Sequence, residues 1–217
     1  MKRRNHFFIS LVFFFIGANG IAQTDWTLKL NKDGIKVYTK NATGSSVKAI
    51  KAECELETSI SVLTSVLLDV NDSKEWIYAT KRVNLLQQVS PTELIYYSEV
   101  SLPWPISNRD FIVDLSITQD SITKTVKAIT TNKPDWLPRN KDIVRVEQSY
   151  SQWMITPLGD NQLHVEYELQ VDPGGCVPAW LVNMFATTGP FCTFQKLREQ
   201  VKKPEYKKDT SIAYIKN

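Results

Sequence analysis

Few residues of this 217-residue chain have the types and spacing that catalysis requires. Glu166 and Glu168 lie two positions apart and share a face if they lie on a strand, and a solvated face explains them better than acid–base chemistry does. His164 is the only histidine after residue 22, so a His-dependent triad or a zinc site lacks partners. Asp172-Pro173-Gly174-Gly175 lacks the lysine and the spacing of a phosphate loop. We therefore expect a protein that is not an enzyme and that needs no cofactor or metal.

A long apolar helix near the C-terminus is predicted to organise the rest of the chain. Pro178 suits the first turn of a helix, where its missing N–H costs nothing. The helical pattern continues to Val201, over about 24 residues and about 36 Å, and Gly189-Pro190 predicts a kink within it. The bulky residues recur mostly every three or four positions: Trp180, Leu181, Met184, Phe185, Thr188, Phe191, Cys192 and Phe194. Such a helix needs a large apolar surface to lie on.

Strand patterns supply that surface. Eight strands are predicted, over residues 35–40, 47–56, 82–89, 93–101, 109–117, 122–130, 141–155 and 163–171. Sequential hairpins of this kind build an antiparallel sheet with one apolar face and one wet face. A short helix is expected over 26–30 and a second from 58 or 59 through 70, with Trp76 in a loop. The predicted fold class is therefore α+β, a curved antiparallel sheet wrapped around the C-terminal helix.

Residues 1–22 have the pattern of a signal peptide. Lys2, Arg3 and Arg4 precede an apolar core of about ten residues, too short to span a bilayer, and small residues lead up to Ala22. We expect cleavage after Ala22 and an exported protein, periplasmic or secreted. Without these three of its 26 Lys and Arg residues, the chain has 23 basic and 23 acidic residues. A net charge of zero argues against nucleic acid as a partner.

The remaining chain is predicted to form one domain over residues 23–203, large enough for a sizeable core or an internal cavity. A basic, flexible tail is expected over 204–217, and we expect a monomer. Cys176 and Cys192 should lie about 24 Å apart along the helix, beyond disulfide reach. Cys54 could pair with either, but three buried, unpaired thiols are the simpler expectation.

Two proline-rich loops join predicted strands, at residues 102–108 and from Thr131 to Asn140. The second loop holds Trp136 between two prolines. An exposed tryptophan suits transient contact with a lipid surface. A plug for the open end of the sheet is an equal alternative.

Two motifs carry a resemblance to a known family. Residues 103–112 (PWPISNRDFI) resemble the central motif of the START family, the lipid-transfer domains related to the steroidogenic acute regulatory protein. Residues 172–183 (DPGGCVPAWLVN) resemble the start of that family's last helix, closest in wording to the phosphatidylcholine transfer protein branch. Trp26, residues 33–38 (DGIKVY) and Asp69 followed by Trp76 match its N-terminal pattern. The match covers nearly the whole chain after the signal peptide.

The resemblance implies a helix-grip fold, like that of START and Bet v 1 proteins, with a tunnel for one lipid or other hydrophobic small molecule between sheet and helix. It also implies that residues 131–140 gate the tunnel. The residues expected to bind the ligand are Tyr96, Ser98, Phe111, Val113, Leu115, Trp136, Tyr167, Leu181, Met184, Phe185, Thr188 and Phe191. From the residue pattern alone, a filled core fits as well as a cavity.

The family's sterol carriers place an acid and a base in the tunnel, and the matching positions here are Tyr96 and Leu115. The resemblance therefore implies a more apolar tunnel. Arg109 and Asp110 are interpreted as structural, with Arg109 paired to a carboxylate. Two alternatives to lipid binding or transfer are a small-molecule sensor and a cyclase- or aromatase-like enzyme. The enzyme would need an inward-facing group, for which Tyr96, Tyr167 and Arg145 are the candidates.

Overall fold

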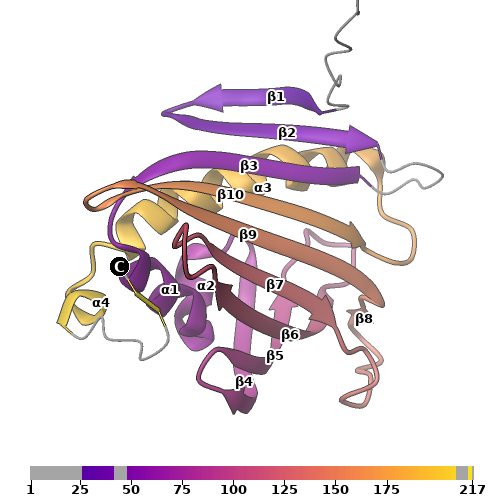
Figure 1. Cartoon of the computed structure of the whole chain (residues 1–217). Helices are drawn as coiled ribbons and strands as arrows, with labels where there is room; N and C mark the ends of the chain where they lie inside the picture. The colour runs from indigo at the N-terminus through magenta and orange to yellow at the C-terminus, as the bar shows by residue number, and fades with distance from the viewer. Residues whose placement is uncertain (1–25, 42–47, 209–214, 217) are drawn as a thin grey trace, which may run out of the picture.

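The structure is a computed structural model that describes residues 26–41, 48–208 and 215–216 (Figure 1). The predicted signal peptide lies outside the described residues. No helix within the described ranges is both long enough and apolar enough to span a bilayer.

A ten-stranded sheet forms most of the domain. Its strands are β1 (Thr27–Lys32), β2 (Ile35–Asn41), β3 (Lys48–Glu57), β4 (Thr80–Ser90), β5 (Glu93–Val100), β6 (Arg109–Gln119), β7 (Val126–Asn132), β8 (Val144–Arg145), β9 (Gln148–Gly159) and β10 (Gln162–Asp172). The order across the sheet is β1-β2-β3-β10-β9-β7-β6-β5-β4, with antiparallel neighbours throughout. Only β8 lies off this path, parallel to the start of β6.

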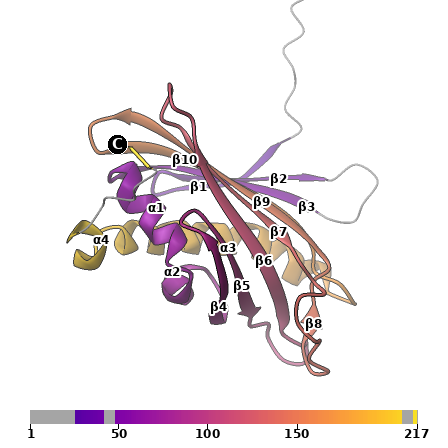
Figure 2. The same cartoon turned by 60° about the horizontal axis from the view of Figure 1, so that its bottom comes forward.

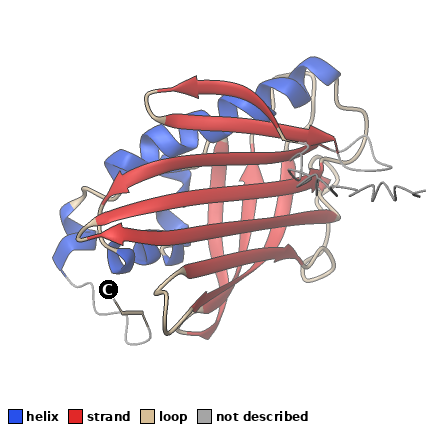
Figure 3. Ribbon diagram, turned by 45° about the horizontal axis from the view of Figure 1, so that its top comes forward, coloured by secondary structure: helices blue, strands red, loops and turns tan. Residues whose placement is uncertain are grey.

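The helices lie on one side of this sheet. They are α1 (Ile60–Leu68), η1 (Val70–Asp72), α2 (Ser73–Trp76), α3 (Ala179–Gln200) and α4 (Pro204–Lys208). The long helix α3 runs across the concave face of the curved sheet, behind β2, β3 and β10 in Figure 3. Figure 2 shows α1 and α2 beside it, near one end of α3. The predicted α+β helix-grip architecture is therefore confirmed.

Several local predictions agree with the structure. Ser59 caps α1, because its Oγ accepts a hydrogen bond of 3.3 Å from the N–H of Val62. The last helix continues through Pro190 and so is not broken there. Asp33 and Gly34 both have positive φ at the tight turn between β1 and β2.

Four local predictions were wrong. Residues 26–30 were expected to be helical, but most of them belong to β1, because pairing with β2 decides the conformation of so short a segment. Trp76 ends the short helix α2 and does not lie in a loop. The strand expected from residue 122 starts at Val126, because Asp120 accepts the N–H groups of Ile122 and Thr123 in a turn. The strand expected over 141–155 is divided into β8 and β9.

An aromatic cluster joins α3 to the sheet. The ring of Trp153 on β9 stacks on Phe194 of α3, with centroids 5.6 Å apart. Tyr167 on β10 lies 4.5 Å and Trp76 of α2 lies 6.1 Å from the Trp153 ring. Truncating a buried aromatic side chain of this kind typically costs about 3–5 kcal/mol. These contacts therefore fix the position of the C-terminal half of α3.

The described residues of the C-terminal tail pack on the domain, and two of the three cysteines are less buried than expected. Tyr206 in α4 is buried, and its hydroxyl donates to Asp69 at 3.0 Å. Ile215 is buried in the core, and the N–H of Lys216 donates to Gln119. The described part of the tail is therefore packed on the domain. The three cysteines are unpaired, as expected, but of the three only Cys54 is buried: Cys192 on α3 is half-buried, and Cys176 is exposed in the loop before α3.

Candidate ligand-binding cavity

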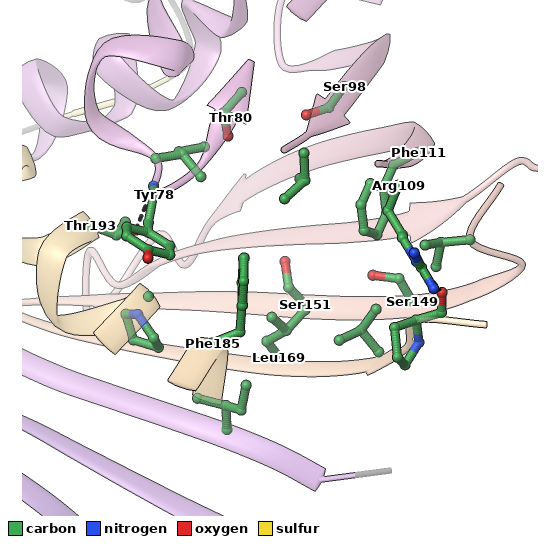
Figure 4. Close-up of a pocket in the computed structure, with 18 of the residues that line it drawn as sticks. Tyr78, Thr80, Ser98, Arg109, Phe111, Ser149, Ser151, Leu169, Phe185 and Thr193 are labelled. Carbon is green, nitrogen blue, oxygen red and sulfur yellow. Dashed lines mark hydrogen bonds between the residues drawn. The ribbon is translucent and has the colours of Figure 1, made fainter. Parts of the chain in front are cut away.

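A cavity of about 600 Å³ lies between the concave face of the sheet and α3. The inward faces of β5, β6, β7, β9 and β10 form one wall, and α3 forms the opposite wall. Residues of α1, η1 and α2 close one end. Figure 4 shows the side chains converging on this space from the strands and from α3.

Eight of the twelve residues expected to bind a ligand line the cavity. They are Tyr96, Ser98, Phe111, Val113, Leu115, Tyr167, Leu181 and Phe185. Their side chains come from alternate positions of β5, β6 and β10 and from one face of α3. The structure places them on the wall, and their role in binding stays a prediction.

The other four residues do not line the cavity. Met184, Thr188 and Phe191 belong to a second stripe of α3 with steps of four and three residues, on the side opposite the cavity-lining stripe. Thr188 is exposed, and Phe191 packs on the core beside Lys32. Trp136 is 46% exposed on the loop after β7 and so does not plug the cavity.

The wall also contains residues that sequence reasoning missed. Ile77 and Tyr78 follow α2 and contribute to the wall, as do Ser149 and Ser151 on β9. The two serines alternate with Trp153 along β9, so period-two alternation could have identified them. Nothing in the pattern marked Tyr78, because it lies in a short connection between two elements.

Tyr78 connects its segment to the middle of α3. Its N–H donates to Oγ1 of Thr193 at 3.0 Å, the dashed line in Figure 4. Its ring packs edge-on against Phe185, with centroids 5.4 Å apart. These two contacts hold α3 over the cavity at a point between its ends.

One end of the cavity is aromatic and buried. Trp76, Trp153 and Tyr167 line it, beside apolar side chains of η1 and β6. Burial raises the pKa of Tyr167 to about 12 and also raises the pKa of Tyr96. Both phenols therefore stay protonated at neutral pH. The indole N–H of Trp76 has no hydrogen-bond partner among the described residues.

The opposite end is polar and reaches the surface. We call it the polar end and define it by Ser98, Arg109, Ser149 and Asp172. Antiparallel pairing brings the end of β5 to the start of β6, and the start of β9 to the end of β10. Asp172 and Gly175 are exposed here, whereas the wall residues at the aromatic end are mostly buried. The cavity therefore has a polar end near solvent and an apolar, closed end.

Arg109 connects the start of β6 to the loop before α3. Its Nε and Nη2 donate to the carbonyls of Pro173 and Gly174 at 3.0 and 2.8 Å, and Nη1 donates to Ser107 at 2.6 Å. Burial lowers the pKa of Arg109. The prediction that Arg109 pairs with a carboxylate is wrong, because all three of these hydrogen bonds go to backbone carbonyls.

Arg145 instead has the carboxylate partner. Its guanidinium makes two hydrogen bonds to Asp110, of 2.7 and 3.1 Å, and both side chains are only 2% exposed. The same guanidinium donates to the carbonyls of Pro134 and Leu137. Arg145 therefore fixes the loop between β7 and β8 onto β6 and does not line the cavity, so it is not free for catalysis.

His164 lies on the outer face of the sheet, away from the cavity. Its Nε2 lies 3.4 Å from Glu166, and these two side chains form a cluster with Glu53. Lys51 lies within 4 Å of both glutamates, and Tyr38 donates to Glu53. Lys51 and the two glutamates therefore form a network of ion pairs on the outer face of the sheet.

The fold is that of a helix-grip protein, with a largely apolar cavity between the sheet and the last helix. The START domain family model matches residues 16–207. The chain is 30% identical over 190 residues to an uncharacterized protein of Pseudomonas aeruginosa. The alignment covers 88% of this chain and 93% of that protein. It is also 30% identical over 171 residues to the phosphatidylcholine transfer protein of Mus musculus. That alignment covers 76% of this chain and 78% of the mouse protein.

A solved structure agrees with these similarities. The STAR-related lipid transfer protein from Xanthomonas axonopodis superimposes with a TM-score of 0.76 and 30% identity, covering 83% of this chain and 100% of that one. The chain belongs to the START domain family.

The buried pair of Asp110 and Arg145 generates a stability prediction. Replacing Asp110→Asn should lower the free energy of unfolding by about 3–5 kcal/mol, because it leaves a buried guanidinium without its counter-charge. The matched control is Glu147→Gln, which breaks the exposed pair of Glu147 with Arg139 and should cost less than about 1 kcal/mol. Urea denaturation of both variants measures the difference. Equal losses in the free energy of unfolding would contradict the prediction that the buried pair stabilises the fold more than the exposed pair does.

Proposed function

We propose that this protein binds a single lipid-class ligand in the cavity between the sheet and α3, and that it stores or transfers that lipid without chemical change. The observation that carries the proposal is the enclosed apolar cavity, closed at its aromatic end. Burial of an acyl chain there contributes about 0.8 kcal/mol per methylene group. Relatives named as lipid transfer proteins support the same conclusion.

A non-enzymatic role agrees with the chemistry of the wall. Burial raises the pKa values of Tyr96 and Tyr167, so these two phenols stay protonated at neutral pH, and Arg145 is occupied by Asp110. Within the described part of the wall, no histidine, cysteine or pair of carboxylates is present. A cyclase-like reaction would lack a base of suitable pKa.

Release of a lipid requires the polar end to open, and we propose that this end makes transient contact with a membrane. Trp136 is half-exposed on the loop that Arg145 holds. Tryptophan favours the interface between lipid and water. Trp180, at the start of α3, is also exposed.

We also propose that the chain is exported and that residues 1–22 are removed. The support is the basic segment, the short apolar core and the small residues before Ala22. Mass spectrometry of the protein from its own host should give a chain that begins at Gln23. A chain that retains the apolar core would contradict the proposal.

A substitution that fills the cavity tests lipid binding. Val113→Trp places a large side chain into the space from β6, and it should weaken uptake of labelled lipid from vesicles by at least about tenfold. Native mass spectrometry of the wild-type chain should show about one lipid bound per protein.

The matched control is Ser116→Trp on the same strand, whose side chain is exposed. It should bind lipid like the wild type, and circular dichroism should show that both variants are folded. Unchanged binding by Val113→Trp, or an equal loss in both variants, would place the ligand elsewhere.

Vesicle sedimentation tests the membrane contact. Trp136→Ala should weaken partition onto phosphatidylglycerol-containing vesicles by about tenfold, since burial of a large apolar side chain contributes about 1.5 kcal/mol. Ile122→Ala is the control, because Ile122 is 88% exposed at the turn between β6 and β7, at the opposite end of these strands. A larger loss of partition for Ile122→Ala than for Trp136→Ala would show that the opposite end of the domain contacts the membrane.

A further inference from the structure

The polar end of the cavity contains a buried cation that lacks a carboxylate partner. Arg109 is 5% exposed, and among the described residues no Asp or Glu forms an ion pair with it. A guanidinium has five N–H groups. Three of them donate to backbone carbonyls, which leaves one N–H on Nη1 and one on Nη2 outside these bonds.

The other buried arginine shows what is missing at Arg109. Arg145, on the neighbouring strand β8, is paired to Asp110 through two hydrogen bonds. A buried charge is expensive unless it is paired as well as hydrogen-bonded. Carbonyl oxygens supply partial negative charge to Arg109, but they do not neutralise it. An anionic group in the cavity would supply the negative charge that Arg109 lacks.

The rest of the polar end also suits an anion. The hydroxyl of Ser149 lies at this end with Arg109, as Figure 4 shows, and it can donate to an oxygen. Asp172 is the one acidic side chain among the described wall residues. It is exposed, and its Oδ1 accepts the N–H of Gly174. Its charge is therefore directed to the loop and screened by solvent.

A quaternary ammonium head is a poor fit to the same place. Such cations bind within cages of several aromatic rings. Phe111 is the aromatic residue on the strands at the polar end, beside Ser98 and Ser149, and a guanidinium repels a second cation. The charge of this end therefore selects against a choline group.

The size of the cavity suits one lipid-class ligand, because sites for such ligands are typically about 300–1,000 Å³ and this cavity has about 600 Å³.

We propose that the ligand is a lipid with an anionic head, a carboxylate or a phosphate. The head lies at the polar end against Arg109 and Ser149, and the apolar part extends toward Trp153 at the aromatic end. This inference rests on the proposed function and specifies the substrate class of the same cavity.

Ligand comparison on the delipidated wild-type mature protein is the first test. Hexadecanoate, hexadecyl phosphate and hexadecanol have the same chain and differ in the head. Titration calorimetry should give about 10- to 100-fold tighter binding for at least one of the two anions than for the alcohol, as expected for a hydrogen-bonded charge. The two anions distinguish a carboxylate from a phosphate head. Phosphatidylcholine vesicles form the fourth arm, from which we expect no stoichiometric uptake.

A variant comparison assigns the effect to Arg109. Arg109→Gln should bring the ratio of anion affinity to alcohol affinity close to one. Arg139→Gln removes the same charge from an exposed position outside the cavity wall, and it should keep the wild-type ratio. If Arg109→Gln does not fold, the comparison of ligands on the wild type still decides the proposal.

Each result has one meaning. Equal binding of the anions and the alcohol would overturn the anionic head but leave lipid binding intact. One phosphatidylcholine bound per chain, with both anions excluded, would overturn the selection against a choline head. Failure of every lipid to bind would overturn the proposed function itself.

Discussion

The packing of one helix across a curved sheet is the constraint on which the rest of this structure depends. The aromatic contacts of Phe194 with Trp153, and the hydrogen bond from Tyr78 to Thr193, hold α3 at its C-terminal half and middle. A single helix is narrower than the concave face of a ten-stranded sheet. The space beside α3 is therefore not filled by side chains, and it forms the cavity.

The polar end of the cavity depends on two neighbouring residues of β6. Arg109 binds the carbonyls of the loop before α3, and Asp110 binds Arg145, which in turn holds the loop between β7 and β8. Adjacent residues on a strand point to opposite faces. The start of β6 can therefore hold two loops at once, one from each face.

The candidate site was only partly predictable, and α3 shows why. The helix carries two stripes of bulky residues with similar spacing, one containing Leu181 and Phe185 and the other containing Met184 and Phe191. Periodicity shows that a stripe exists, but it does not show what each stripe faces. The strand residues were easier to assign, because the alternation on β5 and β6 separates the cavity face from the outer face.

The sequence by itself determined the fold class, most of the strands, the long last helix and the family, because alternation, helical spacing and two motifs are local patterns. Only the tertiary structure decided which residues meet. Arg145 pairs with Asp110 across 35 positions, and Arg109 reaches carbonyls more than 60 positions away. The number of strands also depended on tertiary pairing, since β1 is a strand only because β2 lies beside it. Partners of this kind are fixed by the register of the sheet, and no local pattern contains that information.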